Sequence, residues 1–161
     1  MLMGSIPMID VKHVNCFLQS SISVVDTVTQ VKLTVGKPEK TDFKINKTSY
    51  VIQVGVVGEM KGQVMLAIED ENAKDIASRM MFGMEVKELD EMASSALNEL
   101  GNMIMGNTAT IFSTQGIKID ITPPLSVYGN DFVLKTDIAG IKVPLYNGDK
   151  SYIDLYICVT D

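Results

Sequence analysis

The chain has 161 residues, 46% hydrophobic and 21% charged, which is the size and composition of one globular domain, residues 1–161, and excludes intrinsic disorder. Fourteen Lys and Arg against twenty Asp and Glu give a net charge of −6, which disfavours nucleic acid and anionic membranes as partners. With two cysteines, Cys16 and Cys158, one histidine, His13, no signal peptide and no membrane-spanning run, we expect a soluble cytoplasmic protein without a zinc site.

The first part of the chain is predicted to form one helix followed by three strands. Apolar residues recur at three- and four-residue spacing over residues 9–28, which is typical of an amphipathic helix. Alternating polarity over residues 29–35 predicts a half-buried strand. Two further strands, 50–57 and 63–68, are joined by a hairpin connection with a glycine at each end.

The second part repeats this order with an additional short helix. Asn72 is placed to cap a short helix that runs to about Phe82, where Gly83 ends it. A longer helical pattern extends over about residues 89–113. Four or so strands then follow, over residues 117–121, 125–128, 132–138 and 141–145, the last leading into 152–159.

The order of these elements predicts an α+β fold. Because the strands come in consecutive runs and do not alternate singly with helices, we expect an antiparallel β-sheet with two long helices and one short helix. A helix followed by three strands occurs twice, which indicates a weak internal duplication. The last strand is apolar on both faces, so either the sheet itself or a second subunit must bury it.

The long helix carries two stripes of different character. At about 100° per residue, one side gathers apolar residues that we expect to face the core: Ala93, Ala96, Leu97, Leu100, Ile104 and Ile111. The opposite side gathers Ser95, Glu99, Asn102 and Gly106, and Asn98 and Met105 flank this second stripe. Because Glu99 and Asn102 are three positions apart, their side chains are neighbours on the helix surface.

Taken by itself, this second stripe is explained more simply as an ordinary solvated surface. The same Glu/Asn spacing occurs at Glu69 and Asn72, where Asn72 already has a capping role. The stripe, however, offers Glu99 no basic partner. Gly101 and Gly106 each cost a helix about 1 kcal/mol relative to alanine. Such glycines either permit close packing within the fold or let another macromolecule approach.

The pattern Ser95-x-x-x-Glu99-x-x-Asn102-x-x-x-Gly106 resembles the signature helix of the CheC/CheX/FliY family of chemotaxis phosphatases. Three further blocks resemble that family in the same order: a glycine-rich strand–turn–strand at 55–66, a short helix at 73–84 and a proline-containing strand at 121–129. Together the blocks cover about residues 8–158. The first helix has Lys12 and Asn15 but no glutamate three residues before an asparagine, so the chain resembles the single-site, CheX-like branch.

The resemblance implies a CheC-like fold, a homodimer, and hydrolysis of the aspartyl phosphate of a CheY-like response regulator. In that reaction Asn102 orients the attacking water, because a neutral carboxamide adds no negative charge beside the phosphoryl group. Glu99 docks on a lysine of the partner. The partner's site supplies Mg²⁺, and this chain binds no cofactor. Four further residues are expected to line the contact with the partner: Ser95, Asn98, Met105 and Gly106.

Two other interpretations remain open. A non-catalytic docking module of the same fold would bind a receiver domain or a flagellar switch component without hydrolysis. A purely structural dimer is favoured only if the stripe on the long helix is buried. An acidic cluster of Asp70, Glu71 and Asp75 suits either a divalent metal or, more simply, a solvated helix start.

Overall fold

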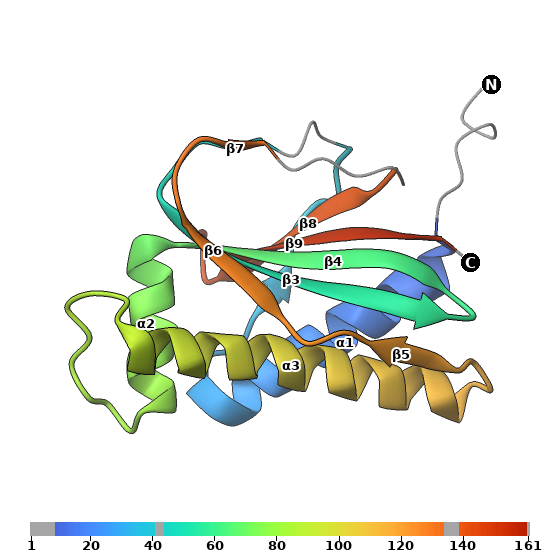
Figure 1. Cartoon of the computed structure of the whole chain (residues 1–161), viewed down its shortest axis with the longest axis horizontal. Coiled ribbons are helices and arrows are strands. Elements are labelled where there is room, and N and C mark those ends of the chain that lie inside the picture. Colours follow the sequence, from blue (N-terminus) through green and yellow to red (C-terminus); the bar gives the residue numbers. More distant parts are fainter. Residues whose placement is uncertain (1–8, 41–43, 134–138, 161) are drawn as a thin grey trace.

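The computed structural model describes residues 9–40, 44–133 and 139–160, in which three helices cover one face of an antiparallel sheet (Figure 1). The two long helices are α1, Val11–Thr29, and α3, Glu91–Thr114, and the short helix is α2, Asp70–Met80. The predicted α+β class, with two long helices and one short helix, is confirmed.

Side chains define where the two long helices begin. The Asp10 carboxylate accepts a hydrogen bond from the Lys12 backbone N–H (3.0 Å), and Asp90 accepts one from the Ala93 N–H (2.9 Å). Both are aspartate N-caps, which satisfy backbone donors that have no partner within the helix.

The prediction that Asn72 caps the short helix is wrong. Helix α2 begins at Asp70, three residues before the start that an Asn72 cap would give, because the chain passes directly from a strand into the helix at Glu69, whose side chain makes no capping hydrogen bond. Asn72 lies within α2, and its side-chain amide donates to the Ser151 carbonyl over 3.1 Å. This residue therefore ties the helix to the sheet.

Two long hairpins make up the centre of the sheet. The first joins β3, Ser49–Gly58, to β4, Lys61–Glu69; the second joins β8, Ile141–Asn147, to β9, Lys150–Thr160. β4 and β9 pair antiparallel and so hold the hairpins together. Because β9 lies between β4 and β8, the sheet itself accounts for the strand that is apolar on both faces.

Short strands complete the edges. β1, Thr34–Val35, pairs with β8, while β5, Ile119–Ile121, and β6, Leu125–Gly129, both pair with β3. The strand predicted over 29–35 is thus reduced to its last two residues, although Val31 and Leu33 are buried without ladder partners.

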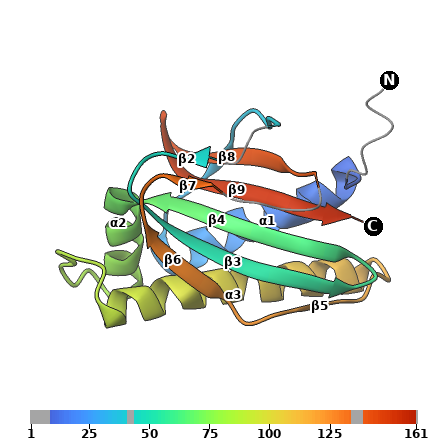
Figure 2. The same ribbon diagram turned by 45° about the horizontal axis from the view of Figure 1, so that its top comes forward.

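A separate pair of strands lies on the face of the sheet opposite the helices. It consists of β2, Lys44–Ile45, and β7, Phe132–Val133 (Figure 2). β7 is the described part of the strand predicted over 132–138, and residues 134–138 lie outside the described residues.

The strand order, β1-β8-β9-β4-β3-β5, is symmetric about the β4/β9 pair. Each half of the chain contributes a long helix, an edge strand and a hairpin. The edge strand of each half pairs with the hairpin of the other half, since β1 joins β8 and β5 joins β3. This topology agrees with the predicted duplication.

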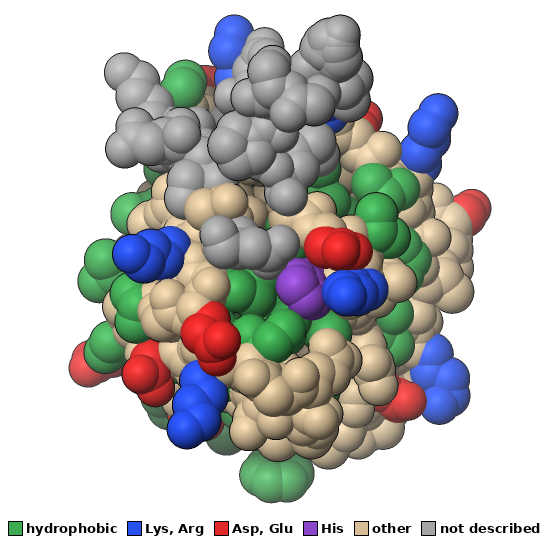
Figure 3. Space-filling view, turned by 90° about the vertical axis from the view of Figure 1, so that its right-hand side faces the viewer, with side chains coloured by type: hydrophobic (Ala, Val, Ile, Leu, Met, Phe, Trp, Pro, Cys, Tyr) green, Lys and Arg blue, Asp and Glu red, His purple; other side chains and the backbone are tan. Residues whose placement is uncertain are grey.

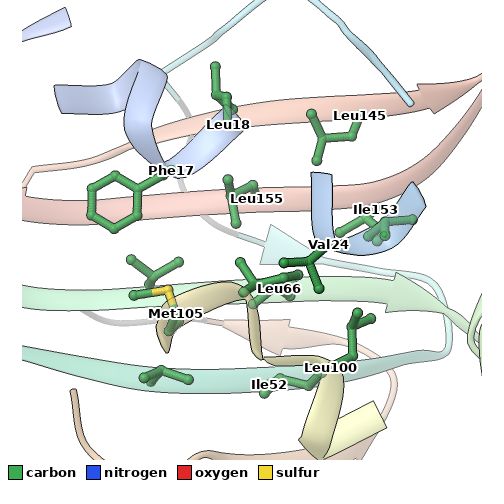
Figure 4. Packing of buried hydrophobic residues seen from close by; sticks show 14 of the residues in the cluster. Phe17, Leu18, Val24, Ile52, Leu66, Leu100, Met105, Leu145, Ile153 and Leu155 are labelled. Carbon is green, nitrogen blue, oxygen red and sulfur yellow. The ribbon is translucent and has the colours of Figure 1, made fainter. Parts of the chain in front are cut away.

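The main core lies between the helices and the sheet. Figure 4 shows Leu100 of α3 beside Ile52 of the sheet, and Val24 and Leu18 of α1 near Leu66 and Leu155. A smaller cluster covers the opposite face of the sheet, where Phe132 packs against these buried residues: Ile45, Val51, Met65, Ala67, Tyr156 and Cys158.

A polar contact joins the two long helices within this core. The buried Ser20 hydroxyl of α1 donates to the Ile104 carbonyl of α3 (2.6 Å) and accepts a hydrogen bond from the Asn107 amide (3.0 Å). The helices are therefore held together by hydrogen bonds as well as by apolar packing.

Candidate active site

The outer face of α3 carries the predicted acid–amide pair. Ser95, Glu99 and Asn102 are all exposed, whereas Leu97, Leu100 and Ile104 on the inner face are buried. Helix α3 contains no Lys, Arg or His. Within the described part of the chain, neither Glu99 nor Asn102 has a side-chain hydrogen bond or ion pair. Because the stripe is exposed, the condition that would favour a purely structural dimer is not met.

A groove runs between this stripe and the connection from β5 to β6. Four of its residues come from α3, one from the end of β5 and three from the connection: Ser95, Asn98, Glu99, Asn102, Ile121, Thr122, Pro123 and Pro124. The Thr122 hydroxyl accepts a hydrogen bond from the Gly55 N–H (2.8 Å), and the Thr122 N–H donates to the Gly55 carbonyl (3.0 Å). The two prolines that follow have fixed φ angles. The groove therefore has a stiff wall opposite Glu99 and Asn102.

Asn98 is held from behind the groove. The buried Tyr50 of β3 donates its hydroxyl hydrogen to Asn98 Oδ1 (2.8 Å), and the Ser126 hydroxyl of β6 lies 2.9 Å from the same Tyr50 oxygen. One hydroxyl thus links β3, α3 and β6 at the base of the groove. Sequence reasoning missed Tyr50 and Ser126, because they lie 48 and 76 residues from their partners in the chain.

The prediction that Met105 is exposed beside the stripe is wrong, because this side chain is fully buried. Figure 4 shows Met105 among the core side chains between α3 and the sheet. Helix α3 packs on both the sheet and α1. At about 100° per residue from Ala96 as zero, its buried residues therefore span about 40° to about 180°, a wider arc than the apolar periodicity predicts. Met105 lies at the far limit of this arc and therefore has no place on the outer face.

The two glycines of α3 serve different purposes. A Cβ atom at Gly101 would lie 2.8 Å from Ile52 Cγ2, so this glycine lets α3 approach β3 closely. A Cβ atom at Gly106 would meet nothing within 4 Å. Packing within this chain therefore requires glycine at position 101 and not at position 106.

The acidic cluster at the start of α2 is neutralised by ion pairs. Lys74 Nζ lies 2.8 Å from Asp70, and Arg79 Nε lies 3.0 Å from Asp75. Burial alone would raise the pKa of Asp70, but hydrogen bonds from Lys74 and Tyr128 outweigh it and hold that pKa below its usual value. Nowhere in the described ranges do three or more His, Cys, Asp or Glu side chains gather to hold a metal ion. The ion pairs at Asp70 and Asp75 favour the simpler expectation of a helix start over a metal site.

The remaining candidates are structural. His13 is buried with its ring edge-on to Phe112, and Cys16 and Cys158 are both buried. At the end of the molecule shown in Figure 3, acidic and basic side chains are interspersed among the described residues without a continuous basic surface. Among the residues that the structure covers, no helix is both long and apolar enough to cross a membrane.

An antiparallel sheet with two long helices on one face, one of which presents an exposed acid–amide pair, is the architecture of CheC-like proteins. Residues 50–145 match the family model described as "Chemotaxis phosphatase CheX", and the chain belongs to this family. The resemblance seen in the sequence is confirmed.

Individual relatives agree with this assignment. The chain is 33% identical over 150 residues to the CheY-P phosphatase CheX of Thermotoga maritima, covering 93% of this chain and 97% of the relative. It is similar to the solved CheX–CheY–BeF3–Mg²⁺ complex of Borrelia burgdorferi (TM-score 0.80, 26% identity, covering 94% of this chain and 100% of the other). A CheC-like superfamily protein from Shewanella sp. PV-4 shares the fold (TM-score 0.85, 24% identity, 95% and 100% coverage).

Proposed function

We propose that this protein hydrolyses the aspartyl phosphate of a CheY-like response regulator, with Glu99 and Asn102 at the site of contact. The observation that carries the proposal is an exposed Glu/Asn pair, without side-chain partners in the described structure, beside a stiff-walled groove in a member of the CheX family. The name of the Thermotoga relative supports the same reaction.

The chemistry needs a positioned water more than it needs a strong base. Attack of water on phosphorus breaks the bond to the aspartyl oxygen, which releases inorganic phosphate and a free carboxylate on the regulator. The Asn102 carboxamide has both a hydrogen-bond donor and an acceptor, so it orients this water without repelling the phosphoryl oxygens. An aspartate at position 102 would add a negative charge at that point.

Mg²⁺ belongs to the partner's site in this proposal. The Borrelia structure contains CheX, CheY, BeF3 and Mg²⁺ together, which supports a receiver that brings its own metal. Charge stabilisation then comes from the receiver, and the contribution of this chain is the position of the attacking water.

Glu99 supplies the electrostatic contact. Its carboxylate is exposed on a helix without basic residues, so a lysine of the receiver would be its first close cation. Such a pair fixes the register of two proteins more than it adds affinity. Ser95, Asn98 and Gly106 border this contact, and Asn98 is oriented by Tyr50.

The decisive experiment measures the decay of a phosphorylated CheY-type receiver in Mg²⁺ with each of three proteins. We expect the wild type to accelerate decay and Asn102→Ala to return it to the receiver's own rate. Asn15→Ala, which removes an exposed asparagine from α1, is the matched control and should behave as wild type. Full turnover by Asn102→Ala would contradict the role of this residue.

A binding measurement separates docking from catalysis. A receiver activated by BeF3 and Mg²⁺ should bind Asn102→Ala as tightly as wild type, and Glu99→Ala about tenfold more weakly. Binding of the receiver by the wild type without any acceleration of decay would indicate the non-catalytic docking module.

We also propose that the protein is a cytoplasmic homodimer. Support for a second subunit comes from the edge strand β6, where Leu125, Val127 and Tyr128 are all more than half exposed. Sedimentation velocity of wild type and Val127→Glu tests this arrangement, since a charge on this edge should shift a dimer toward monomer. A wild type that sediments as a monomer would contradict the dimer.

A further inference from the structure

The loop from α2 to α3 exposes the most solvent-accessible large apolar side chain of the described chain. Phe82 is 101% exposed, and Met84 (56%) and Met92 (59%) are also largely in solvent. Figure 1 shows this loop standing out beyond α2, at the end of the molecule where α3 begins. Among the described residues, none covers the Phe82 side chain.

Phe82 also has a left-handed backbone conformation, which is rare for a bulky residue. Its φ is +60°, and Gly83 after it has φ +84°. The Gly83 N–H donates to the Ser78 carbonyl (2.8 Å), which is the helix-ending pattern in which the position of Phe82 normally prefers glycine. A bulky residue held in a left-handed conformation without burial contributes nothing to folding. Strained residues of this kind are characteristic of functional surfaces.

A groove lies beside Phe82. Its apolar lining comes from Met81, Met84, Val86 and Met92. Its charged lining residues are three acids and one base: Glu85, Glu88, Asp90 and Lys87. Methionine side chains adapt to the shape of a partner. Phe82 and this groove, which we call the Phe82 surface, therefore offer a projecting ring next to an apolar recess with an acidic rim.

The Phe82 surface is continuous with the candidate active site. Met92 precedes Ser95, Glu99 and Asn102 by three, seven and ten positions, so all four side chains share one face of α3. All four are exposed. A partner that covers Glu99 and Asn102 and extends about two turns from Glu99 toward the start of α3 would reach Met92.

We propose that the Phe82 surface is a second docking contact for the same response regulator, a proposal that rests on the proposed function. The regulator would present an apolar side chain to the groove and an apolar recess to Phe82, with basic residues opposite the acidic rim. A second copy of this chain is a poorer occupant, because two acidic rims would then face each other. The contact adds affinity and selects among receivers, while Asn102 performs its role independently.

The test separates KM from kcat in receiver dephosphorylation at varied concentrations of phosphorylated receiver. Phe82→Gly removes the ring and also relieves the backbone, so its melting temperature should not fall. We expect KM to rise about tenfold with kcat unchanged. Phe82→Leu, which keeps an apolar side chain, should recover most of the affinity. Val57→Ala, which trims an exposed apolar side chain of β3, is the matched control and should leave both constants unchanged.

Other results would overturn the proposal. An unchanged KM for Phe82→Gly, with Asn102→Ala inactive in the same assay, would refute the Phe82 contact and leave the phosphatase intact. Wild-type turnover by Asn102→Ala would instead refute the proposed site. A change in the sedimentation of Phe82→Gly without a change in KM would show that the surface joins two copies of this chain.

Discussion

Helices α1 and α3 occupy related positions in the fold but present different surfaces to solvent. Both lie on the same face of the sheet, and an aspartate caps the start of each. Exposed residues of α1 at similar spacing are Lys12, Asn15, Gln19 and Ser23. The corresponding run on α3 is Met92, Ser95, Glu99 and Asn102.

The difference shows that the residues that pack a helix onto the sheet and the residues on its exposed face vary independently. Burial dictates the inner residues of both helices, whereas the outer residues are free to vary. Only α3 combines an acid–amide pair with the stiff wall of residues 121–124 and with Asn98 fixed by Tyr50. A duplicated framework thus carries one site.

The largest effect is expected when the acid–amide pair is moved from α3 to α1. The double variant Lys12→Glu/Asn102→Ala places a glutamate three residues before Asn15 and disables the original site. We expect dephosphorylation to remain at the receiver's own rate, the full loss expected for Asn102→Ala alone, because residues 12 and 15 lie in the first two turns of α1, outside the groove. Restored activity in the decay assay would show that the pair alone suffices.

The next effect is on stability and concerns the place where α3 approaches the sheet. In Gly101→Ala the new methyl group would lie 2.8 Å from Ile52 Cγ2. Overpacking costs about 1–3 kcal/mol, and the higher helix propensity of alanine returns up to about 1 kcal/mol. The free energy of unfolding in urea should fall by about 1–2 kcal/mol. Gly101→Ala/Ile52→Val should recover part of this loss; a stabilised single variant would contradict the close approach.

Loss of the polar contact between α1 and α3 should lower the free energy of unfolding somewhat less than Gly101→Ala does. Ser20→Ala removes the hydroxyl that joins Ile104 and Asn107 of α3 to α1. Because both bonds are buried or half-buried, we expect a loss of about 1 kcal/mol in urea unfolding. A double-mutant cycle with Asn107→Ala measures the coupling, and additive losses would show that the Ser20–Asn107 bond contributes nothing.

The smallest effect has the opposite sign. Gly106→Ala should raise the free energy of unfolding by about 0.5–1 kcal/mol, since alanine is the better helix former and, in the described structure, its methyl group would have no close neighbour beyond its own helix backbone. The same variant should weaken binding to the BeF3-activated receiver if the partner passes close to this position. A stabilised protein with undiminished binding would remove Gly106 from the contact.

Local signals in the sequence were sufficient for most of the fold. The apolar spacing locates α1 and α3, and the glycines at 58 and 62 mark the first hairpin. The prediction for Asn72 was wrong because an asparagine side chain can either cap a helix or bind the sheet from within a helix, and the sequence does not distinguish the two. The order of strands in the sheet, and the exchange of edge strands between halves, depend on contacts distant in sequence and have no local signal.

Only the part of the candidate site that lies on α3 could be predicted from the sequence. Spacing along α3 places Ser95, Glu99 and Asn102 together on the exposed side, as the structure shows. It failed for Met105, because the packing of α1 against α3 widens the buried arc. Tyr50 and the stiff wall come from other elements, so their positions follow from the tertiary structure alone.

The exchange of edge strands bears on how the protein folds. Since β1 completes the sheet beside β8 and β5 completes it beside β3, each half lacks the partner of its edge strand. A fragment that ended between α2 and α3 would leave both β1 and β2 without a pairing partner. Neither half is then a self-sufficient folding unit. We therefore expect a single cooperative unfolding transition, with the same midpoint by far-UV circular dichroism and by the fluorescence of the buried tyrosines.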